Sequence, residues 1–232
     1  MKDFLFTHGR KQGRSIGRLF SLLLIFLSLF SFFACQRKTD YFDYVSELRN
    51  NIFLAKTEEF SLRIHSLVKE SPYASDGVAR ERSARFEAYL VAPEGNKKVD
   101  LVFQIDENSY GGEMSYDNVK GEYYYFCSLD VATRSTLPCL IQYGDREVEL
   151  TANSVLTETT ISPREALKVL QKENAELFST LTDKYGFAGE IYLRLIYEGS
   201  PYYYIGIIDR NGKCNAFLMN AETGKILAKR ES

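Results

Sequence analysis

Residues 19–34, LFSLLLIFLSLFSFFA, form an apolar run without a single charge. Five of the 18 residues that precede the run are lysine or arginine. A basic segment followed by an apolar segment of this kind is the order found in secretory signals. The 16 residues of the run fall short of the roughly 20 that cross a bilayer as a helix. The run therefore predicts a signal peptide over residues 1–34, so that the remaining 198 residues form the fold.

The residues that end the run resemble the lipobox of bacterial lipoproteins. In that family a small residue precedes a cysteine whose thiol receives a diacylglyceryl group before cleavage. Ala34 and Cys35 match this pattern, whereas Phe32 and Phe33 are bulkier than the usual residues. The resemblance implies a lipid anchor of the palmitate type at Cys35 and a position on the extracytoplasmic face of the cell membrane, because the basic flank stays inside. The alternative is an uncleaved signal anchor, in which Cys35 is incidental.

The exported part is mildly acidic. Residues 35–232 contain 24 basic and 30 acidic residues, a formal net charge of −6. Binding to phosphate backbones requires a basic face, so this balance argues against nucleic acid as a partner. The partners expected from the sequence are the membrane, through the lipid anchor, and an envelope or secreted protein.

Most of the exported chain shows strand patterns. Residues 35–40 are interpreted as a lipidated tether, and apolar residues at helical spacing predict a helix over residues 40–50. After this segment apolar and polar residues alternate with period two, which is typical of strands with one buried face. Strands are expected over residues 60–65, 86–90, 101–106 and 123–129, followed by a hairpin of 137–143 with 147–150 around Gly144 and Asp145.

The pattern changes near residue 158. Ser162, Pro163 and Glu165 combine an N-cap, a first-turn proline and a capping box, so a helix is expected to begin there. Four strands are expected to follow over residues 191–197, 202–208, 214–219 and 225–229. Asn211-Gly212 between two of them is a strong hairpin signal.

This C-terminal segment resembles a PepSY domain, whose helix and last hairpin carry short motifs. Residues that match the motifs are Ile161, Ser162, Glu165, Ala166, Ala221, Thr223, Gly224, Lys225, Ile226 and Leu227, while Asn220 replaces an aspartate. The resemblance implies a module that binds or restrains a protein, for example a peptidase. The expected fold class is α+β, with a mainly antiparallel β domain over residues 41–157 and a helix-plus-meander unit over residues 158–232.

No catalytic or metal-binding constellation is evident in the exported part, so neither an enzyme nor a cofactor is predicted. His65 is its one histidine, and alternation places it on the polar face of a strand, as an ordinary surface residue. Cys127, Cys139 and Cys214 lack the spacing of zinc ligands and are interpreted as buried free thiols. A Cys127–Cys139 bridge is the alternative, because pairing cannot be deduced from sequence. Residues 106–117 partly imitate a calcium loop but are interpreted as a hairpin loop.

Two tyrosine runs, 123–125 and Tyr202-Tyr203-Tyr204, are candidates for an interaction surface. Consecutive strand residues point to opposite faces, so at least one tyrosine of each run is expected to face outward. The sequence thus predicts a non-catalytic lipoprotein that binds or restrains a secreted or envelope protein. The alternative is an envelope lipoprotein that binds a solute or glycan in a cleft of the N-terminal sheet, and a deep pocket lined by tyrosines would favour it.

Overall fold

The computed structural model describes residues 39–72, 74–95 and 97–231. The expected signal peptide, Cys35 and most of the expected tether lie outside these residues. The compact unit that holds the described fold is Asp40–Ser232. Within the described residues no helix has the length and apolar character needed to cross a membrane.

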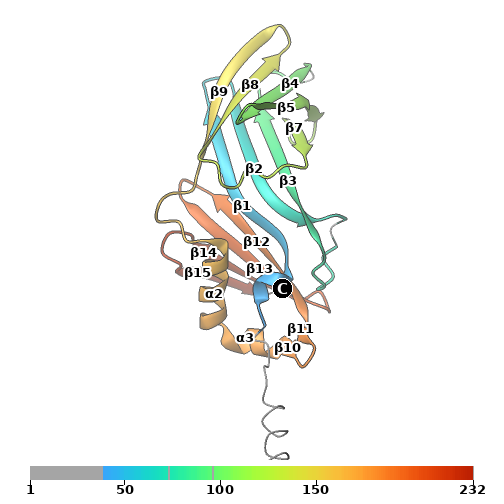
Figure 1. Ribbon diagram of the computed structural model, residues 1–232, viewed down its shortest axis with the longest axis vertical. Helices are drawn as coiled ribbons and strands as arrows, with labels where there is room; N and C mark the ends of the chain where they lie inside the picture. Colours follow the sequence, from blue (N-terminus) through green and yellow to red (C-terminus); the bar gives the residue numbers. More distant parts are fainter. Residues whose placement is uncertain (1–38, 73, 96, 232) are drawn as a thin grey trace, which may run out of the picture. The chain divides into compact units, whose positions relative to one another are not determined.

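A single 13-stranded sheet dominates this unit (Figure 1). Its strands are β1 (Val45–Lys56), β2 (Ser61–Glu70), β3 (Arg82–Val91), β4 (Val99–Ile105), β5 (Asn108–Glu113), β6 (Ser115–Asp117), β7 (Glu122–Cys127), β8 (Thr136–Tyr143), β9 (Arg146–Ser154), β12 (Gly189–Tyr197), β13 (Pro201–Asp209), β14 (Cys214–Asn220) and β15 (Ile226–Glu231). The helical elements are the 3-10 turn η1 (Tyr41–Tyr44), α2 (Pro163–Glu173) and α3 (Ala175–Thr180), and β10 (Thr182–Asp183) pairs with β11 (Gly186–Phe187).

The first half of the chain curls into a nearly closed, barrel-like sheet. Strand β1 pairs with β2 on one side, and β3, β7 and β6 continue from there. On its other side β1 pairs with β9, and β8, β4 and β5 follow. The two arms meet where the chain passes from β5 to β6, at Met114, whose amide donates a hydrogen bond of 2.8 Å to the Val99 carbonyl.

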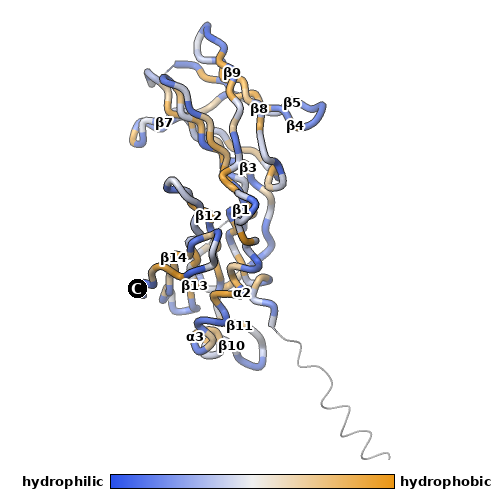
Figure 2. Tube along the Cα trace, turned by 90° about the vertical axis from the view of Figure 1, so that its left-hand side faces the viewer, coloured by the Kyte–Doolittle hydropathy of each residue, from blue (hydrophilic) through white to orange (hydrophobic). Residues whose placement is uncertain are grey.

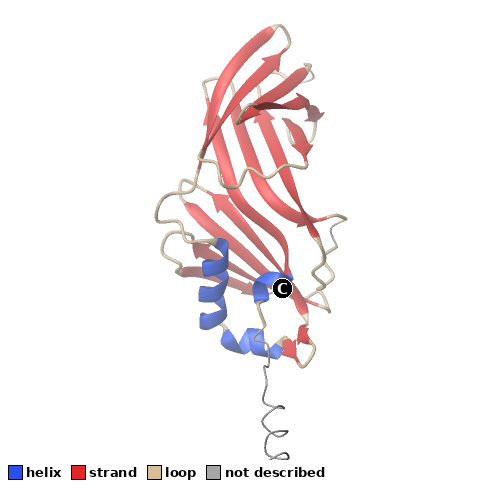
Figure 3. Ribbon diagram, in the orientation of Figure 1, coloured by secondary structure: helices blue, strands red, loops and turns tan. Residues whose placement is uncertain are grey.

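The second half forms the meander β12–β13–β14–β15, with helices α2 and α3 against it (Figure 3). Strand β12 joins this meander to the barrel-like part because it pairs in parallel with β1, from Val45↔Ile191 to Arg49↔Arg194. A hydrophobic cluster beneath the helices contains Leu167, Leu170, Phe178, Leu193 and Phe217, all buried. The helices therefore cover one face of the meander.

The expected α+β fold class is wrong. The structure is 55% strand and 11% helix, and it is a mostly antiparallel, barrel-like β fold rather than a PepSY helix-plus-meander fold. The local signals behind the expectation are confirmed, since the Ser162–Glu165 capping box and the four-stranded meander are present. These local signals do not reveal the non-local pairing of β12 with β1. That pairing joins the meander to the larger sheet. The division of the exported part at residue 158 stays a prediction.

The helix expected over residues 40–50 is also wrong. Residues Tyr41–Tyr44 form one 3-10 turn, and strand β1 begins directly after it at Val45. Strand β1 is hydrogen-bonded on both sides, to β2 and to β12 or β9. This pairing overrides the helical spacing of its apolar residues. The expected strands near residues 60–65, 86–90, 101–106 and 123–129 and the 137–150 hairpin are confirmed as β2, β3, β4, β7 and β8–β9.

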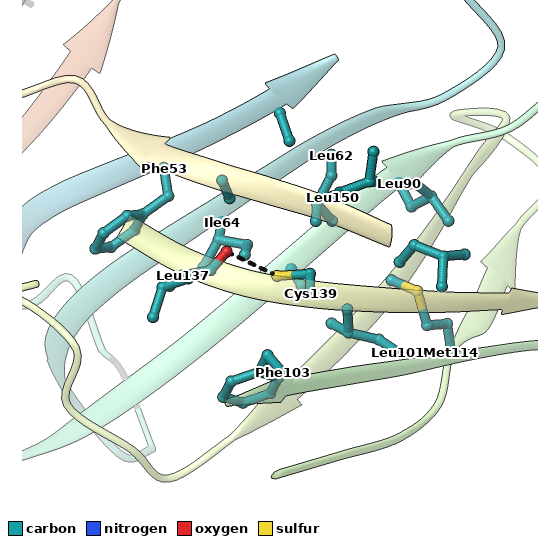
Figure 4. Packing of buried hydrophobic residues seen from close by; sticks show 14 of the residues in the cluster. Phe53, Leu62, Ile64, Leu90, Leu101, Phe103, Met114, Leu137, Cys139 and Leu150 are labelled. Carbon is teal, nitrogen blue, oxygen red and sulfur yellow. Dashed lines mark hydrogen bonds between the residues drawn. The ribbon is translucent and has the colours of Figure 1, made fainter. Parts of the chain in front are cut away.

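The inner face of the sheet is filled with side chains. Figure 4 shows labelled residues from β1, β2, β3, β4, β8 and β9 converging in the barrel-like part, among them Phe53, Ile64, Leu101 and Phe103. The rings of Phe86 and Phe103 stack at 4.2 Å between centroids. A small barrel of this kind has its interior occupied by side chains. The inner face therefore serves as the core.

Candidate functional site on the outer face of the sheet

The outer face is the side of β2, β3 and β7 that points away from the hydrophobic cluster of the barrel-like part, together with its continuation by register onto β1, β12 and β13. Strand registers assign residues to it, because paired residues share a face: His65 pairs with Glu87, which pairs with Phe126. Its members between β7 and β13 include Glu47, Arg49, Arg63, His65, Lys69, Arg85, Glu87, Tyr89, Glu122, Tyr124, Phe126, Tyr192, Arg194, Tyr202 and Tyr204. This face is rich in arginine and aromatic residues.

Strand β1 changes partners in the middle of this face. It pairs with β12 as far as Arg49 and with β9 from Phe53, and a bulge lies between Arg49 and Asn51. Where two strands separate, backbone carbonyls lose their ladder partners. Here Arg49 Nη1 donates to the Leu195 carbonyl at 3.4 Å, and Asn51 Nδ2 donates to the carbonyls of Ala132 and Arg134 at 3.0 and 3.2 Å. Polar side chains therefore occupy the fork between β12 and β9.

A buried ion pair stands beside the fork. Arg194 donates through Nε and Nη2 to the two carboxylate oxygens of Glu47, both at 2.7 Å, and Lys69 Nζ lies 3.8 Å from the same carboxylate. Burial alone raises the pKa of Glu47, but the hydrogen bonds and charge of Arg194, with Lys69 and Arg49, hold it below its usual value. The Glu47 side chain is 4% exposed. Glu47 is therefore an ionised, fully compensated group.

Two nitrogens next to this pair have no hydrogen-bond partner in the described part of the chain, Arg49 Nε and His65 Nδ1. Both atoms are buried. Burial, followed by the positive charges of Arg49 and Arg63, lowers the pKa of His65 to about 3, so the imidazole is neutral at physiological pH. Burial also lowers the pKa of Arg49, partly opposed by the charge of Glu47.

The expectation that His65 is an ordinary surface residue is wrong. Alternation placed its side chain correctly on the outer face, yet the residue is only 8% exposed. The Tyr89 ring lies 5.3 Å from the imidazole and is itself flanked by the Arg63 guanidinium at 5.2 Å. Long side chains from neighbouring strands thus cover the histidine.

Aromatic residues extend the face toward β7. Tyr89 donates its hydroxyl hydrogen to Glu87 at 2.9 Å, and burial, with the charge of Glu87, raises the pKa of Tyr89 to about 12. Arg85 pairs with Glu87 at 2.9 Å and lies over the Phe126 ring at 4.6 Å. Phe126 is 56% exposed and Tyr124 is 40% exposed. An apolar surface bordered by charges is therefore accessible on β3 and β7.

The tyrosine runs alternate as expected. Tyr202 and Tyr204 lie half-buried on the outer face, whereas Tyr203 points into the core, where it is 1% exposed and donates to the Ile161 carbonyl at 2.7 Å. In the other run Tyr123 is buried and Tyr124 faces outward. Tyr203 is thus a structural residue, and only its two neighbours remain candidates for an interaction surface.

No disulfide joins the three cysteines of the described chain, so the alternative Cys127–Cys139 bridge is absent. Cys139 is buried on the inner face, where its Sγ lies 3.4 Å from the Leu137 carbonyl (Figure 4). Burial raises the pKa of its thiol to about 12. Cys127 and Cys214 are half-buried, so burial of all three thiols is confirmed only for Cys139.

Residues 106–117 comprise the turn of the β4–β5 hairpin and the strands β5 and β6, so the hairpin loop interpreted from the sequence is confined to Asp106 and Glu107. Asp106 and Glu107 make the turn between β4 and β5, with φ of 55° at Asp106, and the tip is hydrophilic in Figure 2. The Asp106 carboxylate binds the Arg134 guanidinium at 2.8 and 2.6 Å. Within the residues that the structure describes, no group of three histidine, cysteine or acidic side chains is arranged to hold a metal ion.

A shallow depression of about 350 Å³ lies elsewhere, between α3 and the β14–β15 edge. Charged and amide side chains such as Glu173, Lys213, Asn215 and Glu231 line it, and its lining includes no tyrosine. It is not the deep, tyrosine-lined pocket that would favour a solute- or glycan-binding protein.

Comparisons with known proteins found no match to this chain among family models, curated proteins or solved structures.

Proposed function

We propose that this protein is a lipid-anchored lipoprotein on the extracytoplasmic face of the cell membrane, and that it binds an envelope or secreted protein through the outer face of its sheet. The observation that supports binding is the cluster of arginine and aromatic side chains on that face. Arginine, tyrosine and phenylalanine are enriched at protein interfaces. The inner face is occupied by core residues and offers no comparable surface.

The anchoring part of the proposal rests on residues 1–35, the basic segment, the apolar run and the Ala34–Cys35 ending. The narrower expectation that the partner is a peptidase came from the resemblance to a PepSY domain. Because the fold class implied by that resemblance is contradicted, the partner is proposed only as a protein. The solute- or glycan-binding alternative gains no specific support from the depression beside α3.

The binding proposal is tested by crosslinking in intact cells followed by mass spectrometry. The informative variant is the double substitution Phe126→Ser and Tyr204→Ser, which removes two aromatic groups from the outer face. Tyr185→Ser is the matched control, because Tyr185 is 84% exposed in the turn between β10 and β11. We expect a specific crosslinked protein to be lost in the double variant and kept in the control. Equal recovery from both variants would count against the outer face.

The anchor is tested separately by fatty-acid labelling. We expect Cys35→Ala to abolish incorporation of radiolabelled fatty acid and to leave a precursor of full length, because no thiol then remains at the cleavage position. Cys214→Ala serves as the control, since Cys214 is a half-buried thiol of the folded part. Undiminished labelling of Cys35→Ala would show that the lipobox interpretation is wrong.

A further inference from the structure

The outer face carries a local excess of positive charge on an acidic protein. Between β7 and β13 the described residues of this face include six cationic side chains, Arg49, Lys56, Arg63, Lys69, Arg85 and Arg194, and four acidic ones, Glu47, Glu87, Glu122 and Glu190. The exported part as a whole carries −6. The field of this patch therefore favours a negatively charged group over the surrounding surface.

Arg49 forms no salt bridge within the described residues, although the charges of Glu47 and Glu87 act on it. Three acids of the patch pair with four of its other cations: Glu47 with Arg194 and Lys69, Glu87 with Arg85, and Glu122 with Arg63 at 3.6 Å. The guanidinium of Arg49 makes one weak hydrogen bond, to the Leu195 carbonyl, and its Nε has no partner in the described chain. A buried, unpaired guanidinium is unfavourable, and a carboxylate can compensate it through two parallel hydrogen bonds.

A second nitrogen without a partner lies on the neighbouring strand β2, two residues from Leu67, the register partner of Arg49. His65 Nδ1 is buried and unpaired, and the positive charge of Arg49 acts on this imidazole. His65 is more than nine-tenths buried, so water does not readily satisfy it. Side chains that cover this spot, Tyr89 and Arg63, are half-buried and exposed, respectively. Rotation of these two side chains would open His65 to a ligand.

We propose that this fork in the outer face is a docking site for an acidic segment of the protein partner, with one carboxylate of the segment bound by Arg49 and His65. The proposal rests on the function proposed above and specifies the chemistry of the partner. A carboxylate fits better than a phosphate, because Glu47 and Glu87 act on Arg49 from nearby and repel a doubly charged group more strongly. Exposed Phe126 and Tyr124 supply an apolar border for the rest of the segment.

The test measures binding of fluorescently labelled poly-L-glutamate to the full-length protein in neutral detergent micelles, by anisotropy. We expect Arg49→Gln to weaken binding by at least about tenfold, which corresponds to about 1.4 kcal/mol. Arg49→Lys is expected to recover only part of the affinity, since it keeps the charge and loses the planar fork. The matched control Arg146→Gln removes an exposed arginine that pairs with Glu59 and should change the affinity by less than about twofold.

A second measurement covers the case in which Arg49→Gln does not fold. In the wild-type protein, poly-L-glutamate is expected to shift the NMR signals of Arg49 Nε and of the His65 imidazole. Binding without these shifts, equal losses in Arg49→Gln and Arg146→Gln, or no binding at all would overturn the proposal. Binding to phosphatidylglycerol vesicles in place of poly-L-glutamate would also overturn it and indicate a lipid surface. A crosslinked partner that still depends on Phe126 and Tyr204 would then leave the proposed function standing.

Discussion

The inner and outer faces of the sheet are built from alternate residues of the same strands, but their side chains make different kinds of interaction. The inner face packs Phe86, Phe103 and Ile64 at 0% exposure with stacked rings. The outer face holds ion pairs, aromatic rings and buried nitrogens without a hydrogen-bond partner, among them Arg49 Nε and His65 Nδ1. Close packing specifies the fold, whereas unsatisfied polar groups are costly unless something else binds them. The difference supports the proposal that stability is concentrated on one face and recognition on the other.

The sharpest test of this contrast removes a large ring from each face. Phe86 on β3 is fully buried on the inner face, so Phe86→Ala leaves a cavity as well as losing hydrophobic transfer energy. We expect it to lower the free energy of unfolding by about 4 kcal/mol. Urea denaturation followed by circular dichroism measures this loss. Phe86→Leu, which fills part of the volume, is the control and should lose clearly less; equal losses would show that the interior is not tightly packed.

Glu47→Ala tests whether the outer face contains any structural group of comparable importance. The substitution leaves Arg194 and Lys69 without their carboxylate beside Arg49. Breaking a buried pair from one side typically costs about 3 kcal/mol. We expect a loss of that size by urea denaturation, and part of it should return in Glu47→Ala with Arg194→Met. A loss below about 0.5 kcal/mol would show that this pair stabilises the fold no more than an ordinary surface salt bridge does.

The contrast between faces was only partly predictable from the sequence. Alternation correctly assigned Leu62 and Ile64 to one face of β2 and His65 to the other, because a strand's period of two is a local property. The Ser162–Glu165 capping box was likewise readable, since its partners lie three residues apart. Local signals of this kind predict individual helices and strands, and they do not depend on the sheet that those elements join.

The arrangement of the elements could not be read in this way. Strand β12 pairs with β1 through Ile191 and Val45. No sequence motif predicts a parallel pairing between segments so far apart in the chain. The long separation in sequence also prevented prediction of the centre of the candidate site, because Glu47 and Arg194 are 147 positions apart. The burial of His65 depends on Tyr89 from another strand. Sequence reasoning therefore found the face and missed the cluster on it.

The pH dependence of stability probes His65. Its pKa of about 3 in the folded protein lies below the ordinary value of 6.5. The unfolded chain therefore takes up a proton first as the pH falls, so the stability is fully present above about 6.5 and is lost between about 6.5 and 3. We expect about 2 kcal/mol of loss between pH 7.5 and pH 5 from this residue. His65→Gln should remove that part of the dependence, measured by urea denaturation at each pH.

A wild-type profile that matches the His65→Gln profile would mean that the imidazole is accessible and can be protonated in the folded state. That outcome would also weaken the assignment of an unpaired, water-excluded nitrogen at the fork. Glu47 titrates at lower pH because its pKa is held below the usual value, so its contribution falls outside most of the window that tests His65.

The smallest expected effect on stability is that of a substitution on the outer face. Phe126 is the outer-face counterpart of Phe86 on the neighbouring strand, but it is 56% exposed and contacts the Arg85 guanidinium. Phe126→Ser removes little buried area, so the free energy of unfolding should change by less than about 0.5 kcal/mol. If the outer face is the recognition surface, this nearly neutral substitution should still reduce recovery of the crosslinked partner. A large loss of stability would instead show that Phe126 contributes to the core, and that the outer face also stabilises the fold.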